Sequence, residues 1–440
     1  MIILWTDALI YLLILVMLGL GLYLRGKEHI KRPLQQIGRS KIGMVSLAVL
    51  VFFAMIGVLD SMHFKPADDK KNEIISLLDD WATPLREHGE KTYSAPFATT
   101  LYSKEMMTLA DGSVQWGYPR LEFGGRHLTD PETEKIPDIL QKTLYSLAQG
   151  ASLVIFFLVL LWKRFMRSST AKTVWAVVFI IVLFSYSAIY LSGYYHIFGT
   201  DKVGEDVFYQ AVKSIRTGLV IGTLTTLIML PMAIIFGILA GFFRGWVDDV
   251  IQYIYTTLNS IPSVLLIAAS ILMVQVYMTN HEAAFTSVIV RSDMRLLFLC
   301  MILGVTSWTG LCRLLRAETL KLREMEYVQA ASALGVKQGV ILLRHILPNV
   351  MHIVLISVVL DFSSLVLAEA VLSYINIGVD PTSYSWGNMI NGARLEMARE
   401  PIVWWSLTAA FVFMFALVLA ANLFADVVQD AFDPRRGGID

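Results

Sequence analysis

Two acidic side chains stand inside one long apolar run of this sequence. Asp361 and Glu369 are eight residues apart, which places them roughly on one face if the run is helical. An acid in the middle of a bilayer costs about 2.5–3.5 kcal/mol on insertion scales, so each carboxylate should face protein or water. Two interpretations stay open: the acids line a polar pathway through the membrane, or they form hydrogen bonds that join neighbouring helices.

Motifs for bond chemistry are absent from the sequence. It has no G-x-x-x-x-G-K-[ST] phosphate loop, no H-E-x-x-H, no G-x-S-x-G and no Cys/His spacing typical of a metal site. The two cysteines, Cys300 and Cys312, lie in one apolar run and are interpreted as small buried hydrophobic residues. The eight histidines are scattered and are interpreted as solvated or capping residues. The sequence therefore predicts no catalytic residue and no metal site.

The composition is typical of a chain that crosses a membrane many times. Of its 440 residues, 56% are apolar and 16% are charged, against roughly 45–50% and about 25% in soluble domains. Lys plus Arg (36) balances Asp plus Glu (36), so no overall positive field would attract nucleic acid. A window of about 20 apolar residues selects nine candidate spans: 2–24, 42–60, 144–162, 173–193, 216–243, 250–276, 294–314, 349–375 and 402–427.

The distribution of cations predicts the orientation. Clusters of Lys and Arg follow the first, third and seventh spans and lie near the C-terminus. Such residues are enriched on the cytoplasmic side, and nine spans with the N-terminus outside place all four clusters there. The polar stretch 61–143 then lies outside, where its Pro, Gly and aromatic residues predict a small folded module. Within it, 73–81 is predicted to form a short amphipathic helix and 93–128 short strands and turns.

A short helix off the membrane is predicted between the seventh and eighth spans. Four of its residues share one face because they recur at i, i+1, i+4 and i+7: Tyr327, Val328, Ala331 and Leu334. Gly335 is predicted to end the helix in the left-handed conformation, and Pro348 fits the first turn of the next span. Helices that lie on lipid are typically basic with bulky apolar faces. This helix begins with acids and presents small residues, which favours docking against protein.

The same segment resembles a known family motif. Tyr-Val-Gln-Ala-Ala-x-Ala-Leu-Gly at 327–335, followed by His-Ile-Leu-Pro-Asn at 345–349, resembles the EAA loop of ABC importer permeases, in the version found in the oligopeptide/dipeptide permease family. The general motif has Glu where Gln329 stands, a substitution usual in the peptide branch. The resemblance implies a coupling helix that sits in a cleft of a separate ATPase subunit. The residues that it assigns to coupling are Glu326, Tyr327, Val328, Gln329, Ala330, Ala331, Leu334, Gly335, Leu347 and Pro348.

Further segments are similar to the same family, in order, over about 196–436. They include an FGTD-x-x-G-x-D stretch at 198–206, Ala-Glu-Ala-x-Leu-Ser-Tyr at 368–374 and Ser-Trp-Gly-Asn-Met at 385–389. The family usually has Arg where Glu205 stands, which puts the role of that charge in doubt. The family-motif residues expected to have a structural role are Gly199, Thr200, Asp201, Gly204, Asp206, Trp386, Gly387, Asp433 and Pro434.

The resemblance and the spans together imply an all-α polytopic membrane protein of about nine transmembrane helices. Six of these would form an ABC importer permease core, either span 2 with spans 5–9 or spans 4–9, and a small extracytoplasmic module would lie between spans 2 and 3. The predicted parts are an N-terminal anchor helix and basic cytoplasmic segment (1–41), a transmembrane helix (42–60), the module (61–143), a transmembrane hairpin (144–193) and the permease core (194–440) with its cytoplasmic coupling loop (315–348).

Membership of this family would make the chain the permease subunit of an ATP-driven importer of peptides that works by alternating access. The implied partners are a second homologous permease subunit, two cytoplasmic ABC ATPase subunits, an extracytoplasmic solute-binding protein and the lipid bilayer, with no nucleic acid. ATP and Mg would be used by the ATPases, and this chain would bind no cofactor. The expected location is the bacterial cytoplasmic membrane, with the N-terminus outside and the C-terminus in the cytoplasm.

Two other classes stay open. A proton-coupled secondary transporter would use Asp361 and Glu369 as proton carriers. A membrane-embedded enzyme or sensor would place its function in the module at 61–143.

Overall fold

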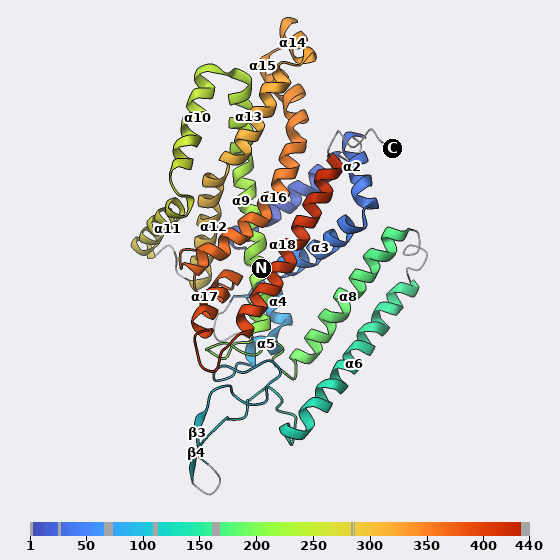
Figure 1. Cartoon of the computed structure of the whole chain (residues 1–440), viewed down its shortest axis with the longest axis vertical. Helices are drawn as coiled ribbons and strands as arrows, with labels where there is room; N and C mark the ends of the chain where they lie inside the picture. The colour runs from blue at the N-terminus through green and yellow to red at the C-terminus, as the bar shows by residue number, and fades with distance from the viewer. Residues whose placement is uncertain are drawn as a thin grey trace. The chain divides into compact units, whose positions relative to one another are not determined.

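Helices make up most of the structure, because backbone N–H and C=O groups in lipid have no solvent partner and must pair within their own segment. The computed structural model describes residues 3–24, 28–65, 74–108, 113–160, 168–282, 285 and 287–432 (Figure 1). Within these residues, six helical stretches are long and apolar enough to cross a membrane: α3 (Lys41–Asp60), α8 (Ser169–Ser192), α9 (Val207–Phe243), α11 (Ser263–Asn280), Gln338–Tyr374, which ends in α16 (Leu347–Tyr374), and α18 (Trp405–Phe432). A shorter apolar stretch lies in α1 (Trp5–Leu24).

Two of the predicted spans are not single helices. The predicted span 250–276 is interrupted at Pro262, because proline lacks the N–H that would continue the ladder and its ring clashes with the preceding turn. The predicted span 294–314 is divided at Trp308. The helices found there are α10 (Gly245–Ser260), α11, α12 (Val288–Ser307) and α13 (Thr309–Arg323). The number of nine spans stays a prediction.

The chain forms two compact units, which are described separately. The first contains residues 38–217 and 384–420, and the second contains residues 3–37, 218–383 and those from 421 onward. Both α9 and α18 contribute residues to each unit.

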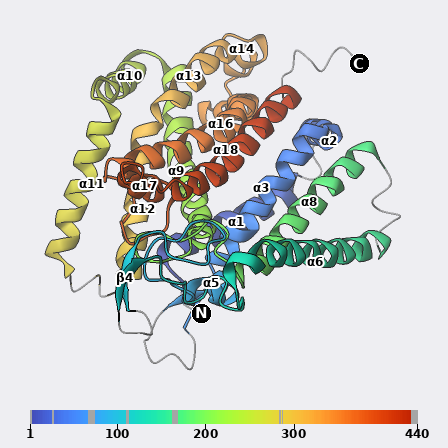
Figure 2. The same cartoon turned by 60° about the horizontal axis from the view of Figure 1, so that its bottom comes forward.

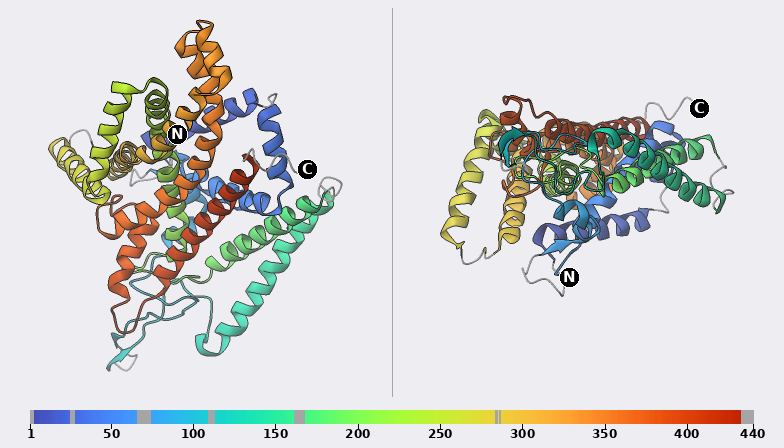
Figure 3. Two further views of the ribbon diagram at one scale, coloured as in Figure 1. Left: turned by 45° about the horizontal axis from the view of Figure 1, so that its top comes forward. Right: turned by 90° about the horizontal axis from the view of Figure 1, so that it is seen from below.

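In the first unit, two long helices lie side by side and form a hairpin. These are α6 (Pro131–Leu160) and α8, and α8 also packs against α3 (Figures 1, 2 and 3). Tyr186 Oη donates to Gln149 Oε1 at 2.8 Å between the two helices. The pair corresponds to the predicted hairpin, except that α6 already begins at Pro131. Residues 131–143, which were assigned to the module, are therefore helical.

The polar stretch after α3 folds as short strands, turns and short helices within the first unit. Its strands form two antiparallel pairs, β1–β2 and β3–β4, and the second pair is a hairpin (Figure 1). A capping box between Ser76 and Asp79 begins α4. The helix therefore starts later than the predicted range 73–81, of which residue 73 lies outside the described residues. The strands predicted within 93–128 are β3 and β4. The elements are β1 (His63–Phe64), β2 (Ile75–Ser76), α4 (Leu77–Trp81), α5 (Thr83–Glu87), β3 (Glu105–Thr108) and β4 (Val114–Gly117).

The second unit is built from consecutive helices. α11 and α12 form an antiparallel pair, which is clear in the right panel of Figure 3. α1 packs against α12, where the backbone N–H of Thr6 donates to the Asp293 carboxylate at 3.2 Å and the Thr6 hydroxyl donates to it as well. The remaining elements are most of α2 (Glu28–Arg39), α14 (Glu326–Ala333), α15 (Gln338–Ile341) and a π-helical turn, η2 (Leu342–Ile346).

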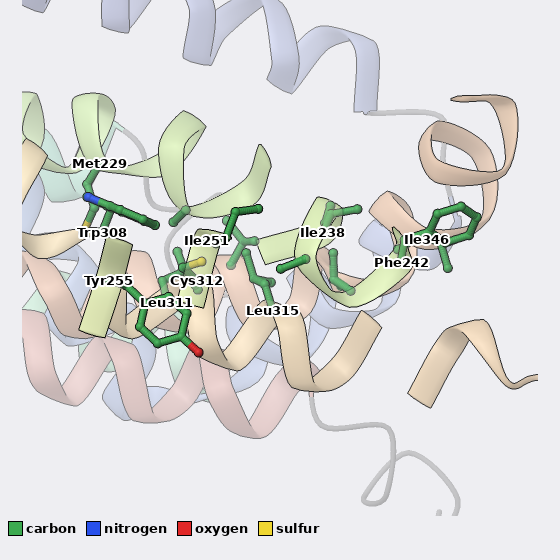
Figure 4. Close-up of a cluster of buried hydrophobic side chains, with 14 of the residues drawn as sticks. Met229, Ile238, Phe242, Ile251, Tyr255, Trp308, Leu311, Cys312, Leu315 and Ile346 are labelled. Atoms are coloured by element: carbon green, nitrogen blue, oxygen red, sulfur yellow. The ribbon is translucent and has the colours of Figure 1, made fainter. Parts of the chain in front are cut away.

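The largest apolar cluster of the second unit surrounds α13 (Figure 4). Trp308, Leu311, Cys312 and Leu315 are buried at helical spacing, so one stripe of α13 faces this cluster. Residues of α9, α10, α14, α15, η2 and the beginning of α16 complete it. Both cysteines are buried and free, and Cys300 lies in a neighbouring apolar cluster. Their interpretation as buried hydrophobic residues is confirmed.

Candidate functional site

The segment between α13 and α16, which the sequence predicts to contact a partner, extends beyond the ends of these two helices in the second unit (Figure 1). Two arginines of α13 hold the helix from which this segment begins. Arg316 binds the Asp248 carboxylate through hydrogen bonds of 2.6 and 2.7 Å, a paired geometry that restrains orientation as well as distance. Arg323 Nη1 donates to Phe242 O at 2.7 Å and so binds one of the last carbonyls of α9.

The end of α14 is a Schellman motif centred on Gly335. This residue has φ +76°. Its N–H donates to Ser332 O at 3.0 Å, and the N–H of Val336 donates to Ala331 O at 3.1 Å. No heavy atom outside the immediate chain neighbours lies within 4 Å of the position that a Cβ would take, so the preference for glycine comes from the backbone conformation alone. The prediction that Gly335 ends the helix in the left-handed conformation is confirmed.

The face of α14 that the sequence predicts to dock against a partner is divided between the chain's own core and the surface. Val328 is only 2% exposed and belongs to the cluster around α13, and Ala331 packs against that cluster. Helical spacing identifies a buried face but not which molecule buries it, so a contact of these two residues with a partner stays a prediction. Leu334, in contrast, is 84% exposed. The outward residues among those predicted are Glu326, Tyr327, Gln329, Ala330 and Leu334.

Side chains tie α14 to the helices on either side of it. Asn349 Nδ2, in the first turn of α16, donates to Tyr327 Oη at 3.2 Å. Gln329 Nε2 donates to Glu324 at 3.3 Å, and the same carboxylate forms a salt bridge of 2.6 Å with Arg244 at the end of α9. The salt bridge is exposed and contributes little stability by itself. Together with the buried Val328, these contacts hold α14 against the core around α13 and link it to the first turn of α16.

The helix that follows begins with a local irregularity that suits its proline. Leu347 N–H donates to Leu342 O, an i to i+5 bond that belongs to η2. Pro348 lies in the first turn of α16, as predicted, and the π-helical turn before it relieves the clash that a proline ring causes in a regular helix. Leu347 packs against the core around α13, whereas Pro348 is exposed.

The two acids of α16 lie in different environments. Glu369 is 1% exposed and accepts a hydrogen bond from Ser373 Oγ at 2.6 Å, which agrees with a role in helix packing. Asp361 is half-buried, and its carboxylate has no hydrogen-bond partner among the described residues. Nearby, Ser363 Oγ donates to Asn422 Oδ1 at 2.5 Å between α16 and α18. The pathway interpretation stays a prediction for Asp361.

In the first unit, the FGTD-type stretch forms a tight loop against the module. Gly204 has φ +83°, and a Cβ there would lie 1.7 Å from Glu90 O. Gly199 has φ +66°, and its Cβ would lie 2.2 Å from Ser94 O. Thr200 Oγ1 accepts the N–H of Ser94 at 2.7 Å. Only glycine fits at the two positions, which explains why the loop has this composition.

Two of the three acids of this stretch, Asp201 and Asp206, have structural roles, as predicted. Asp201 Oδ1 accepts the backbone N–H groups of Val203 and Glu205 at 2.9 and 3.0 Å and so closes the turn. Asp206 Oδ1 accepts the N–H of Tyr209 at 3.0 Å and satisfies one of the free donors at the start of α9.

A buried imidazole joins this loop to the module. His196 Nδ1 lies 2.7 Å from Asp206 Oδ2, and Nε2 lies 3.3 Å from Glu90 Oε1. Burial alone would lower the pKa of His196, but its hydrogen bonds to Asp206 and Glu90 raise this pKa to about 9. Burial would raise the pKa of Glu90, and hydrogen bonds from His196 and from the N–H groups of residues 122–124 lower it to about 2. The His196 imidazolium and the Glu90 carboxylate are therefore charged near neutral pH.

This triad was missed from the sequence, and the interpretation of His196 as solvated is wrong. A second buried ionic cluster was missed as well. Lys213 Nζ of α9 lies 2.7 Å from Asp60 Oδ1 at the end of α3 and 2.7 Å from Asp79 Oδ1 in α4. Glu90 is 106 residues from His196, and Asp79 is 134 residues from Lys213. No local spacing could reveal either cluster. The only signal in the sequence was the presence of single charged or polar residues beside apolar segments.

The remaining family-motif residues are either structural or outside the described ranges. Trp386 is buried at the start of α17 (Trp386–Glu396), and its Nε1 donates to Ala211 O at 3.1 Å. Gly387 is buried next to it. Asp433 and Pro434 lie outside the described residues. Over the part of the chain that the structure describes, no group of three or more His, Cys, Asp or Glu side chains is arranged to hold a metal ion.

Comparison with known proteins identifies similar chains. The family described as "Binding-protein-dependent transport system inner membrane component" matches residues 233–438. A peptide permease protein of Brucella suis biovar 1 (strain 1330) is 32% identical over 242 residues, which are 54% of this chain and 73% of the relative. The dipeptide transport system permease protein DppC of Lactococcus lactis subsp. cremoris (strain MG1363) is 30% identical over 240 residues, 54% of this chain and 64% of the relative. A chain of the MetNI methionine ABC transporter, solved in inward-facing conformations, is 15% identical with a TM-score of 0.36 and covers 50% of this chain and 96% of that chain.

Proposed function

Because this chain belongs to the family of binding-protein-dependent transport system inner membrane components, as a permease subunit of an ABC importer, we propose that it moves peptides and that α14 is its contact with a separate ATPase. The relatives from Brucella suis and Lactococcus lactis are named as a peptide permease and a dipeptide permease. Relatives of this kind are translocation subunits, and the chain is one too, rather than an enzyme. The alternative of a proton-coupled transporter that uses Asp361 and Glu369 is not favoured.

The observation that carries the coupling proposal is the division of α14 into two faces. Val328 anchors the helix to the chain's own core, while Leu334 and Ala330 remain exposed on the surface. An exposed large apolar side chain on a well-seated helix suits a partner's groove. ATP-driven closure of the partner would displace α14, and the Tyr327–Asn349 hydrogen bond and the buried anchor would pass that displacement to α16. The result would be alternating access of the pathway.

The complete transporter that we propose contains further subunits. A second, homologous permease subunit would complete the pathway, two ABC ATPase subunits would bind ATP and Mg in the cytoplasm, and an extracytoplasmic solute-binding protein would deliver the peptide. The chain would lie in a bacterial cytoplasmic membrane with its N-terminus outside and its C-terminus in the cytoplasm. The extracytoplasmic position of the module follows from this orientation.

Two neighbouring alanines of α14 provide a test. Ala330 is exposed and Ala331 packs against the core, so tryptophan at the two positions should act differently. Ala330→Trp is expected to leave the melting temperature of the chain unchanged and to abolish co-purification with the co-expressed ATPase. Ala331→Trp is expected to lower the melting temperature, because overpacking a formed core costs typically about 1–3 kcal/mol.

The matched control is Ala398→Trp, at an exposed position outside this segment. It should change neither the melting temperature nor the recovery of the ATPase. If Ala330→Trp retains the ATPase in full and supports normal transport-linked ATP hydrolysis, the outer face of α14 is not the contact and the coupling proposal is wrong.

A further inference from the structure

A pocket in the first unit has no part in the coupling described above. Its volume is about 350 Å³, near the lower end of the range for small-ligand sites, roughly 300–1,000 Å³. Residues from the module and from the loop after α17 line it together. We name it the tyrosine pocket after the three tyrosines in its lining. The lining includes Tyr93, Tyr102, Tyr118, Lys104, Arg399 and Glu400.

The aromatic wall of the tyrosine pocket is held in place by contacts within the unit. Tyr102 Oη donates to Ile402 O at 3.1 Å, and its ring meets that of Trp405 edge to face with centroids 4.9 Å apart. Tyr93 is buried, and its Oη donates to Glu396 Oε1 at 3.3 Å. A ligand would therefore meet a preformed apolar surface and would not have to order it, which saves part of the entropy of binding.

The rim of the pocket carries charges of both signs. The ammonium of Lys104 lies 5.6 Å from the ring centroid of Tyr118, and the guanidinium of Arg399 lies 4.8 Å from that of Tyr93. These cations rest on aromatic faces, and among the described residues neither of them forms an ion pair with a carboxylate. Glu400 likewise has no cationic partner in the described part of the chain. All three residues are exposed, so a charged ligand can reach them from solvent.

This combination matches the chemistry of a short peptide with free termini. Such a peptide has one carboxylate and one ammonium group, joined by a backbone and by side chains that can stack on aromatic rings. An anion alone would leave Glu400 unused and repelled, and a cation alone would leave Lys104 and Arg399 unused. An internal segment of a folded partner lacks the free termini that the rim could recognise. Rings accept many side chains, so such a site would be tolerant of peptide sequence.

Resting on the proposed peptide cargo, we propose that the tyrosine pocket is a binding site for a short peptide with free termini. Arg399 and Lys104 bind its C-terminal carboxylate, Glu400 binds its N-terminal ammonium, and Tyr102 and Tyr118 hold its side chains. The site belongs to this chain alone and does not require the ATPase.

The test measures binding of the dipeptide Ala-Phe to the full chain in lipid nanodiscs by isothermal titration calorimetry, beside two blocked forms, N-acetyl-Ala-Phe and Ala-Phe-amide. A hydrogen bond to a charged group contributes about 1.5–3 kcal/mol, and the exposed rim puts the effect at the lower end. Arg399→Gln is thus expected to weaken binding of Ala-Phe about tenfold. The amide should bind the unaltered chain about tenfold more weakly, and Arg399→Gln should not weaken it further.

The same comparison of variant and blocked peptide tests recognition of the N-terminal ammonium. Glu400→Gln should weaken binding of Ala-Phe and leave the already weak binding of N-acetyl-Ala-Phe unchanged. The matched controls are Arg126→Gln and Glu122→Gln, which remove exposed charges from the module outside the pocket. Both controls should bind Ala-Phe as the unaltered chain does. Equal melting temperatures of all variants would show that the rim substitutions leave the fold intact.

Three results would overturn the proposal: no binding of Ala-Phe to the unaltered chain, equal binding of free and blocked dipeptides, or rim substitutions that weaken free and blocked forms alike. A pocket that takes a segment of the solute-binding protein would give the first result together with loss of that protein's binding in Arg399→Gln. The tyrosine-pocket proposal and the proposed function can be refuted separately. A chain that transports peptide with normal coupled ATP hydrolysis, yet binds no dipeptide by itself, refutes only the site.

Discussion

Replacement of Gly335 tests how far α14 depends on its Schellman motif. The residue has φ +76°, and no atom lies near its missing Cβ, so a substitution meets conformational strain without a steric clash. An L-residue in the left-handed region costs roughly 1–2 kcal/mol, and a β-branched residue held in a sparsely populated conformation costs up to about 3 kcal/mol. Gly335→Val should therefore destabilise the end of α14 by about 2–3 kcal/mol, which increases the open population roughly 30- to 150-fold.

A series of substitutions separates backbone strain from other causes of a loss of coupling. It consists of Gly335→Asn, Gly335→Ala and Gly335→Val. Asn visits the left-handed region most readily of the three, so its effect should be smallest, with Ala intermediate and Val largest. Transport-linked ATP hydrolysis in proteoliposomes, and hydrogen exchange at the Val336 amide, should change in that order, while the amount of protein in the membrane stays constant. The control is Gly339→Val, where the glycine has an ordinary φ and also open space around its Cβ.

The outcome that would refute this reasoning is specific. If Gly335→Val stimulates the ATPase as the unaltered chain does, the shape of the end of α14 does not matter for coupling. If Gly335→Asn and Gly335→Val reduce ATP hydrolysis equally, the cause is the presence of any side chain at this position and not the backbone conformation.

Other perturbations address the first unit. Glu90 stabilises it fully above about pH 4.5 and loses this contribution as the pH falls through about 2, whereas His196 stabilises it fully below about pH 6.5 and loses its contribution as the pH rises through about 9. Melting temperatures between about pH 2 and 10 should show both losses, and His196→Gln should remove the alkaline one. Gly204→Ala should prevent stable folding, because its Cβ would lie 1.7 Å from Glu90 O; a normal melting temperature in detergent would contradict this. Trp386→Phe removes the hydrogen bond to Ala211 O and should cost about 1–2 kcal/mol, measured by chemical denaturation.

Much of the architecture could be predicted because it depends on local patterns. Apolar runs of sufficient length specify helices, and the proline at 348 marks the first turn of α16 as expected. Gly335 ends α14 because glycine adopts that left-handed backbone conformation at the lowest cost. Proline also explains an error: Pro262 separates two helices where a hydrophobicity window sees one continuous span.

The parts that sequence reasoning missed depend on contacts between distant residues. The charges of Glu90, His196 and Asp206 are placed together by the fold of the module on the loop before α9. Lys213 also meets its carboxylates only in the folded unit. For α14, the spacing of Val328 and Ala331 correctly indicated burial, but a periodic pattern has no information about which molecule provides the other surface.

Site-specific crosslinking at Leu334 tests the central claim most directly. Both native cysteines are buried, so Leu334→Cys supplies one accessible thiol on the outer face of α14, and Val328→Cys supplies a matched buried one. In membrane vesicles that contain the co-expressed ATPase, a short bifunctional reagent should join the thiol at 334 to the ATPase with a yield that changes when ATP is added, and the thiol at 328 should not react. Crosslinks from position 334 to lipid alone, with no ATPase product in either condition, would contradict the account.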